Sequence, residues 1–168
     1  RTDTDQKLIE FKKHLKIPII NGLSPSSHPT QILSDIFTIE EIKKKPIKNL
    51  NICWIGDGNN VLNSLIEAST KFFFNLKIGS PKKYEVKKNL LNWAKKNKAK
   101  IKLYNHPKKA ILNSDVVFAD KFISMNDKTN KKKKIKDFKK FQVNSELMRY
   151  AKKKAIFLHC LPASRGQE

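Results

Sequence analysis

The stretch Leu50-Asn51-Ile52-Cys53-Trp54-Ile55-Gly56-Asp57-Gly58-Asn59-Asn60 is the most informative part of the sequence for the fold class. Residues 50–55 are mostly apolar and predict a buried strand, whereas the residues from Asn60 to Phe73 have apolar side chains at helical spacing. The glycines between these two elements let the backbone turn tightly. A strand that passes through such a turn into a helix is typical of a parallel sheet covered by helices. We expect the inward side of this helix to carry Leu62, Leu65, Ile66 and Phe73.

The same alternation continues through the rest of the chain. Apolar residues recur at helical spacing from Leu8 to Leu15, and a short β-branched run follows from Ile17 to Ile20. Another helix is expected to begin at His28-Pro29, to turn Ile32, Leu33, Ile36 and Ile39 inward, and to end within 43–46. Further elements are expected as strands at Leu76–Ile78, Ile101–Tyr104, Val116–Ala119 and Ala155–His159, and as a helix at Val86–Lys96. The pattern predicts a Rossmann-like α/β domain over residues 46–168, with a parallel sheet and helices on both faces, after a separate segment 1–45.

The charge of the chain invites a nucleic-acid interpretation but does not require one. Lys plus Arg is 36 and Asp plus Glu is 15, which gives a formal net charge of +21. Only Arg1, Arg149 and Arg165 are arginines, and the lysines are spread along the chain beside many Asn, Ile and Phe residues, as A/T-rich codons would produce. The densest run, 131–134, also fits a solvated helix face. A basic nucleic-acid-binding module therefore remains a rival hypothesis that the charge alone does not favour.

The cysteines and the apolar runs restrict the class of protein. Cys53 and Cys160 are far apart and form no C-x-x-C motif, which argues against a disulfide scaffold or a zinc site and suits the reducing cytoplasm. No apolar run approaches the roughly 20 residues of a membrane span. We expect a cytoplasmic protein that binds neither membrane nor metal.

Polar and reactive residues gather where the predicted strands end. In parallel sheets the ligand crevice lies at the carboxyl ends of the strands. The segments at these positions are 56–60, Ser80-Pro81, 120–126 and 159–162. They bring together glycines, a carboxylate and a thiol, so we expect the site at this edge.

Each segment taken alone also has an ordinary structural explanation. The glycine turn can bind an anionic group at a helix start, or can simply join a strand to a helix with Asn as a cap; Val61 breaks the dinucleotide motif G-x-G-x-x-G. Asp120 can hold an ammonium or can be a turn residue. Cys160 can have a lowered pKa near helix amides or can be buried and inert, and His159 beside it points to the opposite face of the strand. His28 and Gln31 share one face of a helix start, where His28 can also be only a cap.

The order and combination of these motifs are more specific. The strings His28-Pro29-Thr30-Gln31, Trp54-Ile55-Gly56-Asp57-Gly58-Asn59-Asn60, Asp120 with Ser124-Met125, and His159-Cys160-Leu161-Pro162 closely resemble the ornithine carbamoyltransferases. The resemblance covers essentially the whole chain. Its Ser-Met and His-Cys-Leu-Pro motifs are the ornithine-specific part, since the related aspartate carbamoyltransferases differ at both places.

The resemblance implies a reaction and a set of site residues. The family condenses carbamoyl phosphate with L-ornithine to citrulline and phosphate, in arginine metabolism, without a metal or organic cofactor. By similarity, Arg1, His28, Gln31, Cys160 and Leu161 would contact carbamoyl phosphate, and Leu23, Asn60, Asp120, Ser124 and Met125 would bind ornithine; Cys160, Asp120, His28 and Arg1 would be the catalytic group. The resemblance also implies a homotrimer, and it assigns residues 1–45 to the remnant of a carbamoyl-phosphate domain with an interdomain helix.

Several features depart from the family pattern. Asn126 replaces a glycine, Ala119 a threonine and Phe122 a tryptophan. The arginine-bearing phosphate loop Ser-x-Arg-Thr-Arg is not found, since the nearest string, 68–71, lacks the arginines, and the C-terminal arginine would lie after Glu168. We therefore expect a fragment that binds ornithine weakly and is inactive alone. A homologue that uses another amine, or one that is catalytically inactive, remains an alternative.

Overall fold

The fold is a five-stranded parallel sheet. In a computed structural model that describes residues 1–123 and 130–168, every strand pairing is parallel and the order is β3-β2-β1-β4-β5. This order places β1 at the centre. Strands β2 and β3 are added on one side of β1, and strands β4 and β5 on its other side, which is the doubly wound arrangement. The predicted α/β class is therefore confirmed. The strands are β1 (Asn51–Ile55), β2 (Asn75–Gly79), β3 (Lys100–Tyr104), β4 (Val116–Ala119) and β5 (Ile156–His159).

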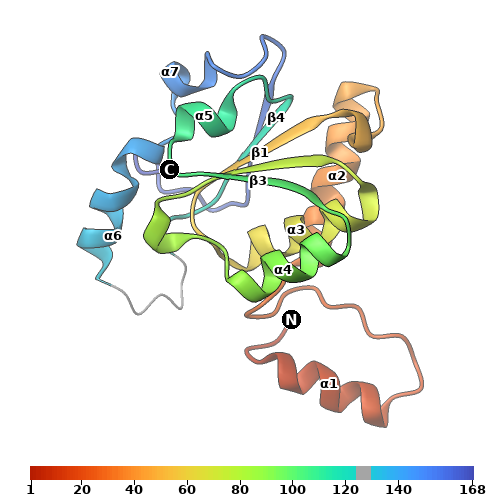
Figure 1. Cartoon of the computed structure of the whole chain (residues 1–168). Helices are drawn as coiled ribbons and strands as arrows, with labels where there is room; N and C mark the ends of the chain where they lie inside the picture. The colour runs from red at the N-terminus through yellow and green to blue at the C-terminus, as the bar shows by residue number, and fades with distance from the viewer. Residues whose placement is uncertain (124–129) are drawn as a thin grey trace.

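Helices cover both faces of this sheet, as the alternation predicted (Figure 1). Helices α2, α3 and α4 pack on one face, and α5, α6 and α7 on the other. Helix α1 lies apart from the sheet and buries no residue. The helices are α1 (Asp5–His14), α2 (Pro29–Lys43), α3 (Asn60–Phe72), α4 (Lys88–Lys96), α5 (Pro107–Ile111), α6 (Lys131–Phe138) and α7 (Ser145–Met148), with single 3-10 turns at Ile47–Asn49, Lys82–Tyr84 and Lys139–Phe141.

Two cores follow from the alternation of side chains along the strands. In β1, Ile52 and Trp54 join the core on the α2–α3–α4 side, whereas Cys53 and Ile55 join the core on the opposite side. Successive side chains of a strand point to opposite faces, and a parallel sheet covered on both faces buries both sets. This is why the stretch 50–55 reads as a nearly continuous apolar run.

Two inward assignments made from the sequence are wrong. Leu33 is 54% exposed, because Ile32, Ile36 and Ile39 already occupy the buried side of α2. Phe73 is 64% exposed, and it lies just beyond α3 in the left-handed conformation, with φ of 58°. That conformation ends the helix and turns the next residue, Phe74, into the core in its place.

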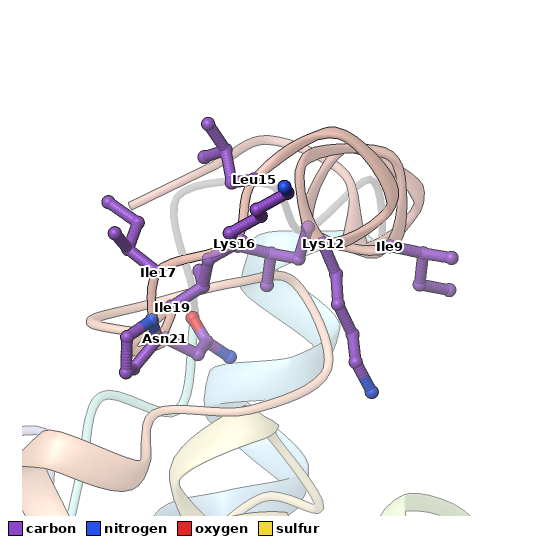
Figure 2. Close-up of a pocket in the computed structure, with 9 residues that line it drawn as sticks. Ile9, Lys12, Leu15, Lys16, Ile17, Ile19 and Asn21 are labelled. Carbon is purple, nitrogen blue, oxygen red and sulfur yellow. The ribbon is translucent and has the colours of Figure 1, made fainter.

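The segment between α1 and α2 forms a hollow away from the sheet. The run from Ile17 to Ile20 forms no strand, and its side chains are exposed. Figure 2 shows it curving beside α1 around a hollow of about 630 Å³ that also includes Lys12 and Lys16. None of the residues that end the strands lines this hollow.

Of the helices in the described ranges, none has the length and apolar character needed to span a membrane.

Candidate functional site

The carboxyl ends of β1, β4 and β5 meet at one edge of the sheet. Ile55 pairs with Ala119, and Ala119 pairs with His159, so these three strands end at the same level. The residues that follow are Gly56, Asp120 and Cys160. The topology thus brings together the glycine turn, the carboxylate and the thiol that the sequence singled out.

The glycine turn after β1 has a steric reason for its glycines. Gly56 has a φ of 153°, which side chains rarely permit. Gly58 donates its backbone N–H to the carbonyl oxygen of Tyr84 at 3.1 Å. A Cβ atom on Gly58 would lie 3.1 Å from that same oxygen and 3.2 Å from the carbonyl of Glu85. The turn therefore packs directly against the 84–85 backbone, and a larger residue would displace it.

Asn59 connects the glycine turn to Asp120. Its Oδ1 atom accepts hydrogen bonds from the N–H groups of Val61 and Leu62, at 3.1 and 3.0 Å, and so caps α3. Its Nδ2 atom donates to Oδ2 of Asp120 at 2.6 Å. The cap thus orients the amide, and the amide orients the carboxylate. Asn59 was anticipated from the sequence only as a possible cap, and its contact with Asp120 was missed.

Asp120 is a largely enclosed carboxylate. Burial raises its pKa, while hydrogen bonds from the backbone N–H of Lys121 and from Asn59, together with the charge of His159, oppose that rise. Within 1–123 and 130–168, no ion pair joins Asp120 to a lysine or arginine. A carboxylate enclosed in this way favours a cationic ligand, which would compensate its burial.

Cys160 faces the same edge from the end of β5, but its thiol is not activated. It packs against the core on the α2–α3–α4 side. Burial, followed by the charges of Asp120 and Asp35, raises its pKa to about 11. The suggestion that helix amides lower this pKa is therefore wrong, because burial and the charges of these two carboxylates raise it. Cys160 is a neutral thiol near neutral pH.

His28 is the N-cap residue of α2 and interacts electrostatically with Arg1. Burial lowers the pKa of His28, the charge of Arg1 lowers it further, and Asp120 acts in the opposite direction. The backbone N–H of His28 donates to Ser64 at 2.8 Å, and its buried Nδ1 atom has no hydrogen-bond partner within the described part of the chain. Electrostatic interactions thus link His28 to both Arg1 and Asp120.

The other predicted contact residues lie around this group. Asn60 donates its side-chain N–H to the carbonyl of Ser24 at 3.0 Å, which ties the start of α3 to the segment that holds Leu23. Gln31 lies one turn into α2 and donates to Asp35. Leu161 is 75% exposed and follows Cys160 along the rim.

Two of the predicted ornithine contacts, Ser124 and Met125, lie outside the described residues, as does Asn126. Phe122, just before them, is buried and stacks on Phe138 with ring centroids 4.4 Å apart. The phenylalanine that replaces the family's tryptophan therefore helps to anchor α6 on the sheet.

A buried ion pair near the glycine turn was not anticipated. The lysine-rich run was interpreted as a solvated helix face, which holds for 131–133, but Lys134 is only 3% exposed. Its ammonium pairs with the carboxylate of Asp57 and lies 5.3 Å from the ring centre of Tyr84. Asp57 in turn accepts from the N–H of Gly58 at 2.9 Å. Helix α6 is thereby tied to the turn that carries Asn59.

Two models of one protein family match this chain. The Asp/Orn binding domain of aspartate/ornithine carbamoyltransferases matches residues 48–168, and their carbamoyl-P binding domain matches residues 1–41. The chain belongs to the aspartate/ornithine carbamoyltransferase family. Among curated members of this family, the ornithine carbamoyltransferases of Caldicellulosiruptor saccharolyticus and Agrobacterium fabrum are 44% and 42% identical over the whole chain. The chain spans about half the length of these carbamoyltransferases, 56% and 54% respectively.

Solved carbamoyltransferase structures share the fold. The anabolic ornithine carbamoyltransferase of Campylobacter jejuni superposes with a TM-score of 0.92 at 38% identity, over 99% of this chain and 56% of that one. The ornithine carbamoyltransferase of Pyrococcus furiosus gives 0.90 at 36% identity, over 99% and 54%. The resemblance inferred from the motifs is therefore confirmed at the level of the family and the fold.

Proposed function

We propose that this chain serves carbamoyl transfer from carbamoyl phosphate to L-ornithine, giving citrulline and phosphate. The observation that carries the proposal is the enclosed Asp120 carboxylate at the strand edge, next to Cys160 and within electrostatic reach of His28. Such a carboxylate suits an amino-acid ammonium. Membership of the carbamoyltransferase family supplies the reaction class.

The ornithine end of the site would be built around Asp120. Asn59 orients this carboxylate so that it can accept from the α-ammonium of ornithine. By similarity to the family, Ser124 and Met125 would complete the contacts to the amino-acid end, and Asn60 and Leu23 would line the site. Cys160 would border the side-chain nitrogen, and since its thiol is neutral it does not itself hold that nitrogen as a cation.

The carbamoyl phosphate end would be built from the start of α2. Arg1, whose charge acts on His28, and His28 itself would donate to the carbonyl oxygen, on which negative charge develops during the attack. Because the pKa of His28 is lowered, its imidazole is neutral at neutral pH but still carries one N–H donor. Gln31 would contact the carbamoyl group from the next turn, and Cys160 and Leu161 would complete this end.

The reaction would then proceed by direct attack. The neutral δ-amine of ornithine forms a bond to the carbamoyl carbon, and the bond from that carbon to the phosphate oxygen breaks. The amine loses one proton, which the leaving phosphate accepts, so that the step needs no cofactor or metal. Much of the rate would come from holding the two substrates in line.

We also propose the organisation of the protein that carries this chain. The domain boundary would lie at 45/46, after α2, with residues 1–45 belonging to a carbamoyl-phosphate domain and residues 46–168 to the ornithine-binding domain. A homotrimer and a location in the cytoplasm are the family-based expectations for the assembly and the compartment.

A citrulline assay tests the proposed function. The protein expressed from its complete reading frame is supplied with carbamoyl phosphate and, in separate reactions, with ornithine, putrescine or N-acetylornithine. Citrulline formed from ornithine, in excess over product from the other two amines, is the expected result. A product from putrescine or acetylornithine alone would assign a different acceptor. Absence of any product with purified, folded protein would overturn the proposal.

A further inference from the structure

A side-chain hydrogen bond joins Gln31 and Asp35 on α2. Gln31 and Asp35 lie one helical turn apart, and Nε2 of Gln31 donates to Oδ1 of Asp35 at 3.0 Å. An ionised carboxylate can only accept hydrogen bonds, whereas a glutamine amide has a donor end and an acceptor end. The bond therefore commits the NH₂ end of Gln31 to Asp35 and leaves the carbonyl oxygen Oε1 for another partner.

Asp35 also lies close to the candidate site. Its charge is one of the causes that raise the pKa of the Cys160 thiol, which places the carboxylate near the end of β5. Burial raises the pKa of Asp35 to about 6, against the hydrogen bond from Gln31, and no lysine or arginine in the described ranges pairs with it. A partly buried carboxylate without a cation costs stability. Its place on α2 is therefore better explained by what it orients than by what it stabilises.

We propose that Asp35 is a positioning residue for carbamoyl transfer, holding the Gln31 amide with its Oε1 atom toward the NH₂ group of carbamoyl phosphate. This inference rests on the proposed function, in which Gln31 contacts carbamoyl phosphate. The carbamoyl NH₂ offers two N–H donors and needs an acceptor. Arg1 carries donors only, so it cannot supply that acceptor.

If Asp35 positions Gln31, the KM for carbamoyl phosphate should depend on the protonation state of Asp35, which a purely structural role would not require. A protonated Asp35 carboxyl can donate a hydrogen bond to Oε1 of Gln31 as readily as it accepts one from the NH₂ group. Protonation therefore removes the preference for one orientation of the Gln31 amide. In the part of the chain that the structure describes, Asp35 interacts with Gln31 of its own helix, which does not titrate, and with Cys160 at the end of β5, which remains a neutral thiol at this pH. The KM for carbamoyl phosphate should therefore rise as pH falls through about 6.

The experiment compares Asp35→Asn with wild type in the citrulline assay, using the protein expressed from its complete reading frame. The variant is isosteric, but its side chain can donate as well as accept, so it no longer fixes the Gln31 amide. We expect the KM for carbamoyl phosphate to rise about tenfold, with kcat changed less than about threefold, and the step near pH 6 to disappear. Asp3→Asn makes the same chemical change on an exposed residue and should leave both parameters unchanged.

A double-mutant cycle separates positioning from a general structural effect. If Asp35 acts through Gln31, then Asp35→Asn in a Gln31→Ala background should raise KM less than about twofold further. Full additivity of the two effects would overturn the proposal. If Asp35→Asn does not fold, the wild-type profile decides: a KM step near pH 6 that Gln31→Ala abolishes supports the proposal, and its persistence in Gln31→Ala overturns it.

The two proposals fail in different ways. Wild-type protein that forms no citrulline overturns the proposed function, and the role of Asp35 falls with it. Wild-type protein that forms citrulline while Asp35→Asn keeps its KM and its pH profile overturns only the role of Asp35.

Discussion

Replacing Lys134 by methionine tests whether the buried ion pair holds α6 on the glycine turn. The Lys134 and Asp57 side chains are 4% and 16% exposed, so the pair lies in a poorly solvated environment. Methionine keeps most of the aliphatic length of lysine and removes only the charge. It leaves the Asp57 carboxylate enclosed with its bond from Gly58, but without the ammonium.

The expected loss follows from removing this ammonium from beside the enclosed Asp57 carboxylate. Breaking a buried pair by removing one partner typically costs about 3–5 kcal/mol. Because Asp57 keeps the Gly58 hydrogen bond and some contact with water, we expect the lower end, about 3 kcal/mol in the free energy of unfolding. The double variant Lys134→Met/Asp57→Asn removes both charges and should recover at least half of the loss.

Urea denaturation followed by circular dichroism measures these free energies. Lys133→Met, one residue earlier on the exposed side of α6, is the matched control and should lie within about 0.5 kcal/mol of wild type. If Lys134→Met were as stable as Lys133→Met, or if the double variant were less stable than Lys134→Met, the buried ion pair would not be what holds α6 on the glycine turn.

Three further predictions follow from the site. Asn59→Ala should lower the free energy of unfolding by about 1 kcal/mol through loss of the α3 cap, and should also raise the Kd for ornithine; unchanged ornithine binding, measured by calorimetry, would contradict the Asn59–Asp120 link. The pKa of Asp35 is about 6, above its ordinary value of 3.8, so the folded chain holds this proton more tightly than the unfolded chain does. The Tm of wild type relative to Asp35→Asn should therefore rise as pH is lowered from about 7 to about 4, and a pH-independent difference would contradict this account. Cys160, with a pKa of about 11, should react with iodoacetamide at pH 8 more slowly than free cysteine, and mass spectrometry of the alkylated peptide would show the opposite if the thiol were activated.

The strands and the edge of the sheet that carries the site could be predicted from the sequence, since the strands are recognised by their apolar residues and the edge follows from the order of the strands. A parallel strand buried on both faces must be apolar at almost every position, so 50–55 and 116–119 stand out in the sequence. Chain connectivity then places the residues after neighbouring strands at one edge, which brings Asp120 and Cys160 together without further information.

The features that were missed depend on contacts between distant segments. Asn59 and Asn60 are adjacent and identical, and only the position of the helix start makes Asn59 the residue that reaches Asp120. Similarly, Lys134 ends a run of four lysines that look alike locally, and only the packing of α6 against Asp57 singles it out.

The raised pKa of Cys160 is a third feature that depends on distant parts of the chain and was missed. The direction of its shift is determined by burial, by Asp120 and by Asp35, of which Asp35 is more than a hundred residues away in sequence. A motif can locate such a thiol, but the neighbours that determine its charge state come from the fold.

Calorimetric titration of L-ornithine into wild-type protein and into Asp120→Asn tests whether the enclosed carboxylate at the strand edge binds the substrate. If the enclosed carboxylate binds the α-ammonium, then Asp120→Asn should raise the Kd by roughly ten- to a hundredfold, the equivalent of one charged hydrogen bond, while Asp3→Asn binds as wild type does. Equal affinity of Asp120→Asn and wild type for ornithine would contradict the assignment of this strand edge as the ornithine site.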